Sequence, residues 1–399
     1  MKAHWICDAD TAQRADMSAL GAVKMSLDRA TSIADVALTA GESVSDLLKL
    51  MREKVVAAKD TSLNTTSRQS LNADFQGILK NFSQVLNSAV FDGANLLDGS
   101  QTADMTFLAD ADAGQAITLS KKLADKGAVN GAGLAKLMAS EKRDYTFAQT
   151  FPTGTHAMWL YYWLAAHGIN PMKDAKVITV PPPQMVANMR VGNMDGFCVG
   201  EPWNHRAIID GIGVTATTTQ EIWKDHPEKV LGTTGEFVKK YPNTARAVTA
   251  AIIEAGKWID ASLSNKNKMA ETIADKSYVN TGVDAINQRI LGRYQNGLGK
   301  TWDDPNHMKF FNDGAVNYPY LSDGMWFLTQ HKRWGLLKSD PDYLGVAKAI
   351  NKTTLYKEAA AQLKISVPKS DLRSSKLIDG VVWDGKDPAK YADGFKIKA

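Results

Sequence analysis

The start of one predicted helix carries groups that could bind a small anion. The segment TFPTGTHAMW places Gly154, Thr155 and His156 where a short strand gives way to a helix. The amides of a helix amino terminus favour negative charge, glycine lets the backbone approach a ligand closely, and an imidazole N–H can donate to an oxyanion. A histidine at such a place is more often a cap or a surface residue, so the segment predicts an anion site only together with further donors.

A second group of interest is a cation in the segment EIWKDHPEKVLG. Lys229 stands between a proline turn and the start of an apolar strand, where its side chain can be aimed into a cleft. Most lysines are solvated surface residues, but an ammonium group is also a compact charge with three donors. Lys229 is therefore a candidate anion contact beside His156.

Two carboxylates near the middle of the chain do not form a catalytic pair. Asp195 and Glu201 flank GFCVG, which is typical of a strand, and no nucleophile or second base stands beside them. We therefore expect no catalytic residues and no enzyme activity. Trp203 follows the same strand and, with Glu201, could form the wall of a ligand cleft, although an aromatic residue there packs in a core at least as often.

Strands and helices alternate after about residue 113, which predicts an α/β fold with a parallel sheet. The expected strands are ITLS, YTFAQ, KVITV and GFCVG, and the expected helices follow GTHAMW or span QMVANMR, NTARAVTAAIIEAGKWID and TLYKEAAAQLKI. Pro152, Thr153 and Thr155 are start signals for the first helix, and Asn243 with Thr244 for the third. In VPPPQ, three consecutive prolines end a strand and fix the start of the next helix.

The front of the chain differs, because apolar or small residues recur there at seven-residue intervals. This spacing predicts two helices that pair antiparallel, joined by the polar turn KDTSLNTTSRQS, in which Thr66 or Ser67 caps the second helix. No histidine or cysteine lies between Leu20 and Ser100, so we expect no transition-metal site there. The rows of the first helix are Leu20, Leu27, Ala34, Gly41, Leu48, Val55 and Val23, Ala30, Ala37, Val44, Met51, and those of the second are Leu71, Ile78, Val85 and Phe75, Phe82, Ala89.

Length and composition indicate a folded chain with two or more cores. The 399 residues are 44% hydrophobic and 23% charged with a net charge of +4, so we expect neither disorder nor a nucleic-acid partner. Cys7 and Cys198 lie in segments of different character, which argues against a structural disulfide. No run of about 20 apolar residues could span a membrane. No secretory signal is visible, which leaves extracellular and cytoplasmic locations open.

The front segment, from about residue 20 to residue 112, resembles the amino-terminal rod-domain helices of bacterial flagellin. The similar stretches are SLDRATSIADVALTAGESVSDLLKLMREKVVAAKD and SRQSLNADFQGILKNFSQVLNSAVFDGANLLDGS, of which FDGANLLDGS is the most specific. The resemblance implies a helical rod that packs against neighbouring subunits, here through residues 20–90. The extreme amino-terminal helix and the carboxy-terminal partner helix of flagellin are not recognisable.

The rest of the chain resembles the nitrate-binding proteins of nitrate and bicarbonate ABC importers. The motifs are TFPTGTHAMWLYYWLAAHGI, VPPPQMVANMRVGNMDGFCVGEPWN, IWKDHPEKVLG and YPYLSDGMWFLTQHKRWG. The resemblance implies a bilobal α/β fold of the periplasmic-binding-protein type (type II), no catalysis, and anion contacts at Gln115, His156 and Lys229. Relatives that bind bicarbonate with calcium carry a carboxylate where this chain has Lys229, so the resemblance favours nitrate or nitrite and implies no calcium.

Together these patterns predict a composite chain: residues 1–112 are a flagellin-like helical hairpin, residues 114–230 a second lobe, and residues 231–399 a return to an incomplete first lobe followed by carboxy-terminal helices. Its expected role is to deliver nitrate or nitrite to the membrane subunits of an ABC importer, in the periplasm or at the membrane, without a metal or other cofactor. Two alternatives remain, namely a flagellin-type filament protein with a fused outer domain and a cytosolic nitrate sensor.

Overall fold

The computed structural model describes residues 39–88, 90–91, 94–95, 105–112 and 114–399. The chain divides into two compact units, Met1–Ala103 and Asp104–Ala399. Strand β3, Met105–Asp112, pairs with β9, Pro227–Thr234, and therefore belongs to the second unit. The predicted boundary at residue 112 had assigned this strand to the front segment. Among the described residues, no helix is long and apolar enough to cross a membrane.

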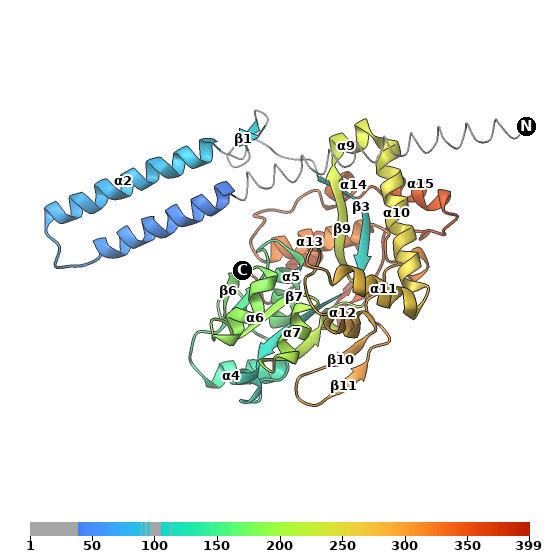
Figure 1. The fold of residues 1–399 in the computed structure, drawn as a ribbon, viewed down its shortest axis with the longest axis horizontal. Helices are drawn as coiled ribbons and strands as arrows, with labels where there is room; N and C mark the ends of the chain where they lie inside the picture. Colours follow the sequence, from blue (N-terminus) through green and yellow to red (C-terminus); the bar gives the residue numbers. More distant parts are fainter. Residues whose placement is uncertain (1–38, 89, 92–93, 96–104, 113) are drawn as a thin grey trace, which may run out of the picture. The chain divides into compact units, whose positions relative to one another are not determined.

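The first unit contains the predicted pair of antiparallel helices (Figure 1). Residues 39–58 form one helix and α2, Thr65–Ser88, forms the other. Lys54 Nζ lies 2.7 Å from Asp74 Oδ2 across the pair. Asn64 accepts a hydrogen bond from the Ser67 amide at 2.8 Å, so Asn64, and not Thr66 or Ser67, caps α2. The short strands β1, Val90–Phe91, and β2, Ala94–Asn95, follow as a hairpin.

Only one of the two apolar rows predicted for the first helix faces its partner. Val44 and Met51 are half-buried, whereas Leu48 is 50% exposed and Val55 is 47% exposed. Two paired helices can cover only a narrow stripe on each other, so the row through Leu48 and Val55 was wrongly predicted as a packing face. Both rows of α2 face the first helix as predicted, as far as they are described. Residues 20–38 and Ala89 lie outside the described residues.

A five-stranded sheet forms the core of the second unit, with the strand order β6-β5-β7-β4-β8. Strand β5 runs parallel to β6 and β7, but β4 runs antiparallel to both β7 and β8. The predicted strands are all present, whereas the sheet is mixed and not purely parallel. The strand bounds are β4 Gln115–Ser120, β5 Thr146–Gln149, β6 Lys176–Thr179, β7 Gly196–Gly200 and β8 Gly213–Thr218.

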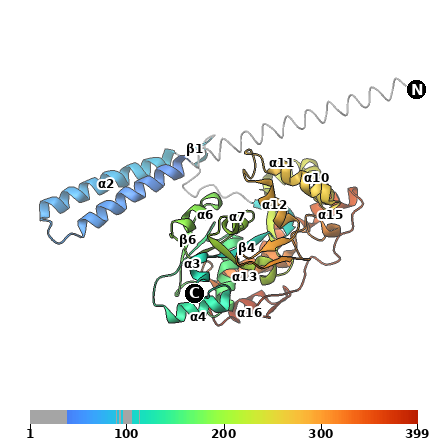
Figure 2. The same ribbon diagram turned by 60° about the horizontal axis from the view of Figure 1, so that its bottom comes forward.

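Helices cover both faces of this sheet. Alternate residues of each strand point to opposite sides, so the apolar strands place buried side chains on both faces. Phe147 and Cys198 pack in a core with α5, Thr155–Ala166, while Ala148 and Phe197 pack in a second core with α6, Pro182–Arg190, and α7, Trp203–Ile209. Figure 2 shows α6 and α7 on the side of the sheet opposite α13, Leu321–Arg333. The helix α5 is buried on nearly every side, so it is a rigid support for residues at its start.

The carboxy-terminal segment completes the core beneath α5. Trp326 of α13 stacks on Trp159 of α5 with ring centroids 4.9 Å apart, and Trp383 belongs to the same core. We had expected residues 231–399 to return to the first lobe and to form carboxy-terminal helices. The structure packs α13 and Trp383 with α5 in the core of the five-stranded sheet, because their large aromatic side chains bury their apolar area there.

The other lobe contains a two-stranded sheet, β3 with β9, and the helices α9, Gly235–Lys240, α10, Pro242–Asp260, α14, Tyr343–Ile350, and α15, Thr353–Gln362. Helix α10 packs on α15, and its Val248, Ile252 and Trp258 side chains are exposed. Asn243 and Thr244 lie inside the first turn of α10, so they do not cap it.

Smaller elements connect these parts of the second unit. They are α3 Lys121–Ala124, α4 Gly131–Ser140, α8 Thr219–Ile222, α11 Leu263–Ile273, α12 Val283–Ile290, β10 Arg293–Gln295, β11 Thr301–Asp303, η1 Asn312–Gly314, β12 Ser375–Lys376, β13 Val382–Trp383 and α16 Pro388–Asp393.

Candidate functional site

One end of the five-stranded sheet gathers most of the predicted anion contacts. Strands β5, β7 and β8 end there, and β4 begins there with Gln115, which lies opposite Gly200 of β7. Ligands of α/β proteins usually bind beyond the carboxyl ends of the parallel strands, where loops and helix starts meet. Because β4 is antiparallel to its neighbours, its first side chain joins the loops at this end.

The Gln115 side chain is buried, and within the described part of the chain only the nitrogen of its amide has hydrogen-bond partners. Its Nε2 donates to Thr155 Oγ1 at 3.3 Å and also to Glu228 Oε1. Its Oε1 has no hydrogen-bond partner among the described residues. Buried amides normally use both ends, so the unpaired oxygen and the adjacent donors indicate a site that a ligand or water would complete.

The start of α5 contributes the predicted helix terminus and histidine. Gly154 is the amino-terminal cap and offers no side chain to the free amides of the first turn. His156 is 8% exposed, and its Nδ1 lies 2.8 Å from Thr150 Oγ1. Burial, reinforced by the charges of Lys229 and His226, lowers the pKa of His156 to about 3. The ring is therefore neutral near pH 7, and its Nε2 is without a partner in the described structure.

Lys229 reaches the site from its edge. Its side chain is 73% exposed, whereas the neighbouring Glu228 side chain is 9% exposed, because successive strand residues alternate in direction. Lys229 Nζ lies 3.1 Å from Glu228 Oε1, the same oxygen that accepts the Gln115 amide. Gln115 and Lys229 therefore converge on one point, which a carboxylate oxygen of the protein occupies.

Glu228 is the residue of this site that the sequence analysis missed. In the segment HPEKV, Lys229 was predicted as an anion contact, and the preceding Glu228 was given no role. The twofold period of a strand gave the available signal, since it directs Glu228 inward when Lys229 lies at the margin. In effect, this carboxylate takes the place that an anionic ligand would need.

A second layer of hydrogen bonds fixes Gln115 against the start of β9. Thr219 Oγ1 donates to the Gln115 carbonyl at 3.0 Å and lies 2.7 Å from His226 Nε2. His226 Nδ1 lies 2.9 Å from the Pro227 carbonyl, and its ring packs on Trp159 with centroids 4.6 Å apart. Burial lowers the pKa of His226 to about 4. This network was also missed, because a sequence shows no contact between positions so far apart.

The two predicted cleft-wall residues have other surroundings. Trp203 is half-buried and packs against the core that contains Ala148 and Phe197, which is the packing role left open by the sequence. Glu201 faces Arg289, with 3.1 Å between Oε1 and Nε. Its backbone amide donates to the Gly114 carbonyl at 2.7 Å, so it borders Gln115 through the main chain.

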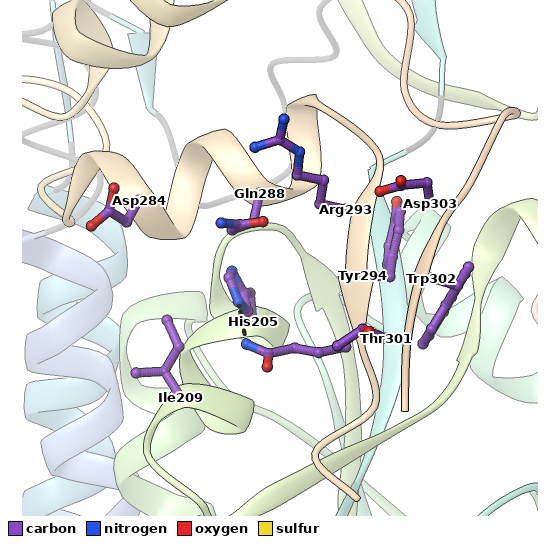
Figure 3. A pocket seen from close by; sticks show the side chains of 10 residues that line it. His205, Ile209, Asp284, Gln288, Arg293, Tyr294, Thr301, Trp302 and Asp303 are labelled. Atoms are coloured by element: carbon purple, nitrogen blue, oxygen red, sulfur yellow. Dashed lines mark hydrogen bonds between the residues drawn. The ribbon is translucent and has the colours of Figure 1, made fainter. Parts of the chain in front are cut away.

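A larger hollow, of about 590 Å³, lies between α7, α12 and the β10–β11 hairpin. Figure 3 shows Asp284 and Gln288 on one side of it and Trp302 with Asp303 on the other. It is lined by residues other than Gln115, His156 and Lys229. In the part of the chain that is described, no three side chains of the His, Cys, Asp and Glu types gather as a metal site would require.

The chain is similar to a known protein family and to proteins named for nitrate binding and nitrate import. Residues 52–274 match the NMT1-like family. The chain is 40% identical over 297 residues to the nitrate/nitrite binding protein NrtA of Nostoc sp., a match that covers 71% of this chain and 66% of that protein. It is 35% identical to the nitrate import ATP-binding protein NrtC of Synechocystis over 71% of this chain and 42% of that protein.

Solved structures give the same match. The crystal structure of the periplasmic nitrate-binding protein NrtA from Synechocystis superposes with a TM-score of 0.70 and 35% identity, over 75% of this chain and 80% of that chain. The sequence match to NrtA of Nostoc, at 66%, spans just under two-thirds of the length of that relative.

Proposed function

The chain belongs to the NMT1-like family, and from this membership we propose that it is a solute-binding protein that captures nitrate or nitrite for an ABC importer. The proposal rests most directly on one observation: Gln115 and Lys229 donate to a single oxygen beside the start of α5. The free Nε2 of His156 supplies a further donor from that helix start. Such a set suits a small oxyanion.

The charges at the site favour an anion with one negative charge. Lys229 carries one positive charge, and neutral His156 and Gln115 add donors without adding charge. A flat anion with oxygens in one plane can take one donor at each oxygen. Glu228 already neutralises Lys229 in this structure, so the ligand binds only if it displaces that carboxylate or shares the lysine with it.

Delivery to an importer is proposed from the relatives. One is named as a nitrate-binding protein and another as an ATP-binding protein of nitrate import. The membrane subunits of such an importer would receive the anion, which corresponds to a periplasmic or membrane-associated location. The role requires binding and release and no chemical step, so we propose no enzyme activity.

Titration calorimetry with nitrate, nitrite, bicarbonate and chloride tests the binding function. The parent protein should bind nitrate or nitrite more tightly than the other two anions. Lys229→Ala should weaken that binding by roughly ten- to a hundredfold, as expected for one lost charge-assisted contact. Lys224→Ala is the matched control, because Lys224 is an exposed lysine of the preceding turn. Equal nitrate affinity in the parent and Lys229→Ala would refute the site assignment.

We also propose that the front hairpin is a flagellin-like addition to this binding protein, able to associate with its own kind through residues 20–90. Its support is the sequence resemblance, the separate compact unit and the exposed row through Leu48 and Val55. The family match begins at residue 52, inside the hairpin. Electron microscopy of the purified protein decides this point, since concentration-dependent filaments or rods support self-association and monodisperse particles at every concentration refute it.

A further inference from the structure

Arg289, a charged side chain outside the proposed nitrate site, lies buried beside a separate cavity. Arg289 of α12 is 3% exposed and lines a hollow of about 120 Å³. Glu201 also lines the hollow, and the remaining walls are mostly apolar and come chiefly from α11, α12 and the segment before η1. They include Met269, Ile273, Ile286, Ile290, Met308 and Phe310.

The guanidinium of Arg289 is poorly satisfied by the protein. Its Nε lies 3.1 Å from Glu201 Oε1. Within the described residues, however, neither Nη1 nor Nη2 has a hydrogen-bond acceptor, and the Nε contact itself is not a well-aligned hydrogen bond. The Tyr294 ring packs against the guanidinium, 4.4 Å from Cζ to the ring centroid, and offers no acceptor in that direction. Buried donors of a charged group without acceptors are strongly unfavourable, so an occupant that supplies acceptors would be stabilised.

We propose that this cavity is a second binding site, specific for a short-chain monocarboxylate such as propionate. A guanidinium presents its donors in a planar fork that fits a carboxylate. Glu201 faces the Nε edge, which leaves the two terminal nitrogens for the ligand. The alkyl end of the ligand then contacts the apolar side chains of α11 and α12.

The size of the cavity and the polarity of its walls limit the class of ligand that it can bind. A water takes up about 30 Å³ of liquid volume, so the cavity holds roughly four water-sized groups. That space suits an acid of four or five heavy atoms and excludes long fatty acids. Nitrate is disfavoured here, because the fork pairs with two of its three oxygens and the third would face aliphatic side chains without a donor. Tyr294 also lines the larger hollow of Figure 3, so the two hollows are neighbours.

Binding of propionate to the full chain is measured by titration calorimetry, with acetate, octanoate and neutral propionamide as comparisons. Propionate should bind saturably with one site per chain, and propionamide and octanoate at least tenfold more weakly. Ile273→Phe fills the cavity and keeps the Arg289–Glu201 pair, so it should abolish propionate binding. Arg293→Met is the matched control, because Arg293 is an exposed arginine just after α12, and it should bind propionate like the parent.

Removal of the charge is tested with Arg289→Met, which should weaken propionate binding by about ten- to a hundredfold. This variant leaves buried Glu201 without its cationic partner, so Glu201→Gln combined with Arg289→Met provides a neutral version if the single variant does not fold. Lys229→Ala should leave propionate binding unchanged, which separates this site from the nitrate site. No saturable binding in the parent, equal binding in Ile273→Phe, or a crystal grown with propionate that shows only water beside Arg289 would overturn the proposal.

Discussion

Gln115 and Lys229, from two different strands, donate to the same oxygen atom of Glu228. This relationship shows that the two donors converge on an acid of the protein. In the proposed function, anion binding would then be an exchange, in which a diffusible oxyanion replaces a tethered carboxylate. The affinity of the site depends on the difference between these two interactions.

Removal of the internal carboxylate should therefore strengthen binding. We expect Glu228→Gln to bind nitrate about tenfold more tightly or better, because the competing charge beside Lys229 is lost while a polar side chain remains. Calorimetry measures the change, and Glu236→Gln, at an exposed acid of α9, serves as the control. Weaker nitrate binding in Glu228→Gln would mean that the acid supports the ligand and does not compete with it.

The two buried histidines should make the fold sensitive to acid. Burial lowers the pKa of His156 to about 3 and that of His226 to about 4, below the usual value of 6.5. Between those values the unfolded chain binds protons that the folded chain does not, so stability is full above about pH 6.5 and falls as the pH drops toward 4. We expect His156→Gln to lose less thermal stability than the parent between pH 7 and pH 5.

Thermal unfolding followed by circular dichroism at those two pH values measures this difference. His167→Gln is the control, because His167 lies partly exposed at the end of α5. An identical loss of melting temperature in the parent and His156→Gln would contradict the role given to burial of this ring.

The hydrogen bonds behind Gln115 should matter for affinity as well as for stability. Thr219→Val keeps the shape of the side chain but leaves His226 Nε2 and the Gln115 carbonyl without their shared partner. We expect a loss of about 1–3 kcal/mol of stability and nitrate binding several-fold weaker. Chemical denaturation and calorimetry measure the two effects. Thr301→Val, at an exposed residue of β11, should change neither, and normal nitrate affinity in Thr219→Val would limit the network to a structural role.

The packing face of the front hairpin can be tested by charge substitution. Met51→Lys places a charge in the half-buried face toward α2, whereas Leu48→Lys places it on the exposed row. Hydrogen exchange in the full chain should show faster exchange of the α2 amides in Met51→Lys and little change in Leu48→Lys. Equal effects of both substitutions would contradict the observed pairing face.

The sequence predicted four strands of the five-stranded sheet, because they are short apolar runs between clear helix signals, and it missed β8. ITLS and GFCVG became adjacent strands, and the helix predicted to follow GTHAMW begins within it, at Thr155. The direction of the strands was harder to predict from the sequence. A run such as ITLS is apolar on both faces whichever way it runs, so its composition could not show that β4 is antiparallel to β7.

Contacts between distant residues limited the prediction of the site. Local patterns suggested His156 and Lys229, and the resemblance added Gln115. The structure brings Gln115 and Lys229 to Glu228, which no local pattern marked as a partner of Gln115. For Trp203 the sequence left two roles open, because an aromatic side chain after a strand fits a cleft wall and a core equally well. Its packing against Ala148 and Phe197 depends on the fold of α6 and α7.

The most direct test of the anion site is a crystal structure of the protein grown with nitrate. The account predicts nitrate within hydrogen-bond distance of Gln115 Nε2, His156 Nε2 and Lys229 Nζ, with the Glu228 carboxylate turned away from its present position. An unoccupied site with the Glu228 carboxylate still held by Gln115 and Lys229 at saturating nitrate, or nitrate bound away from these three side chains, would contradict it.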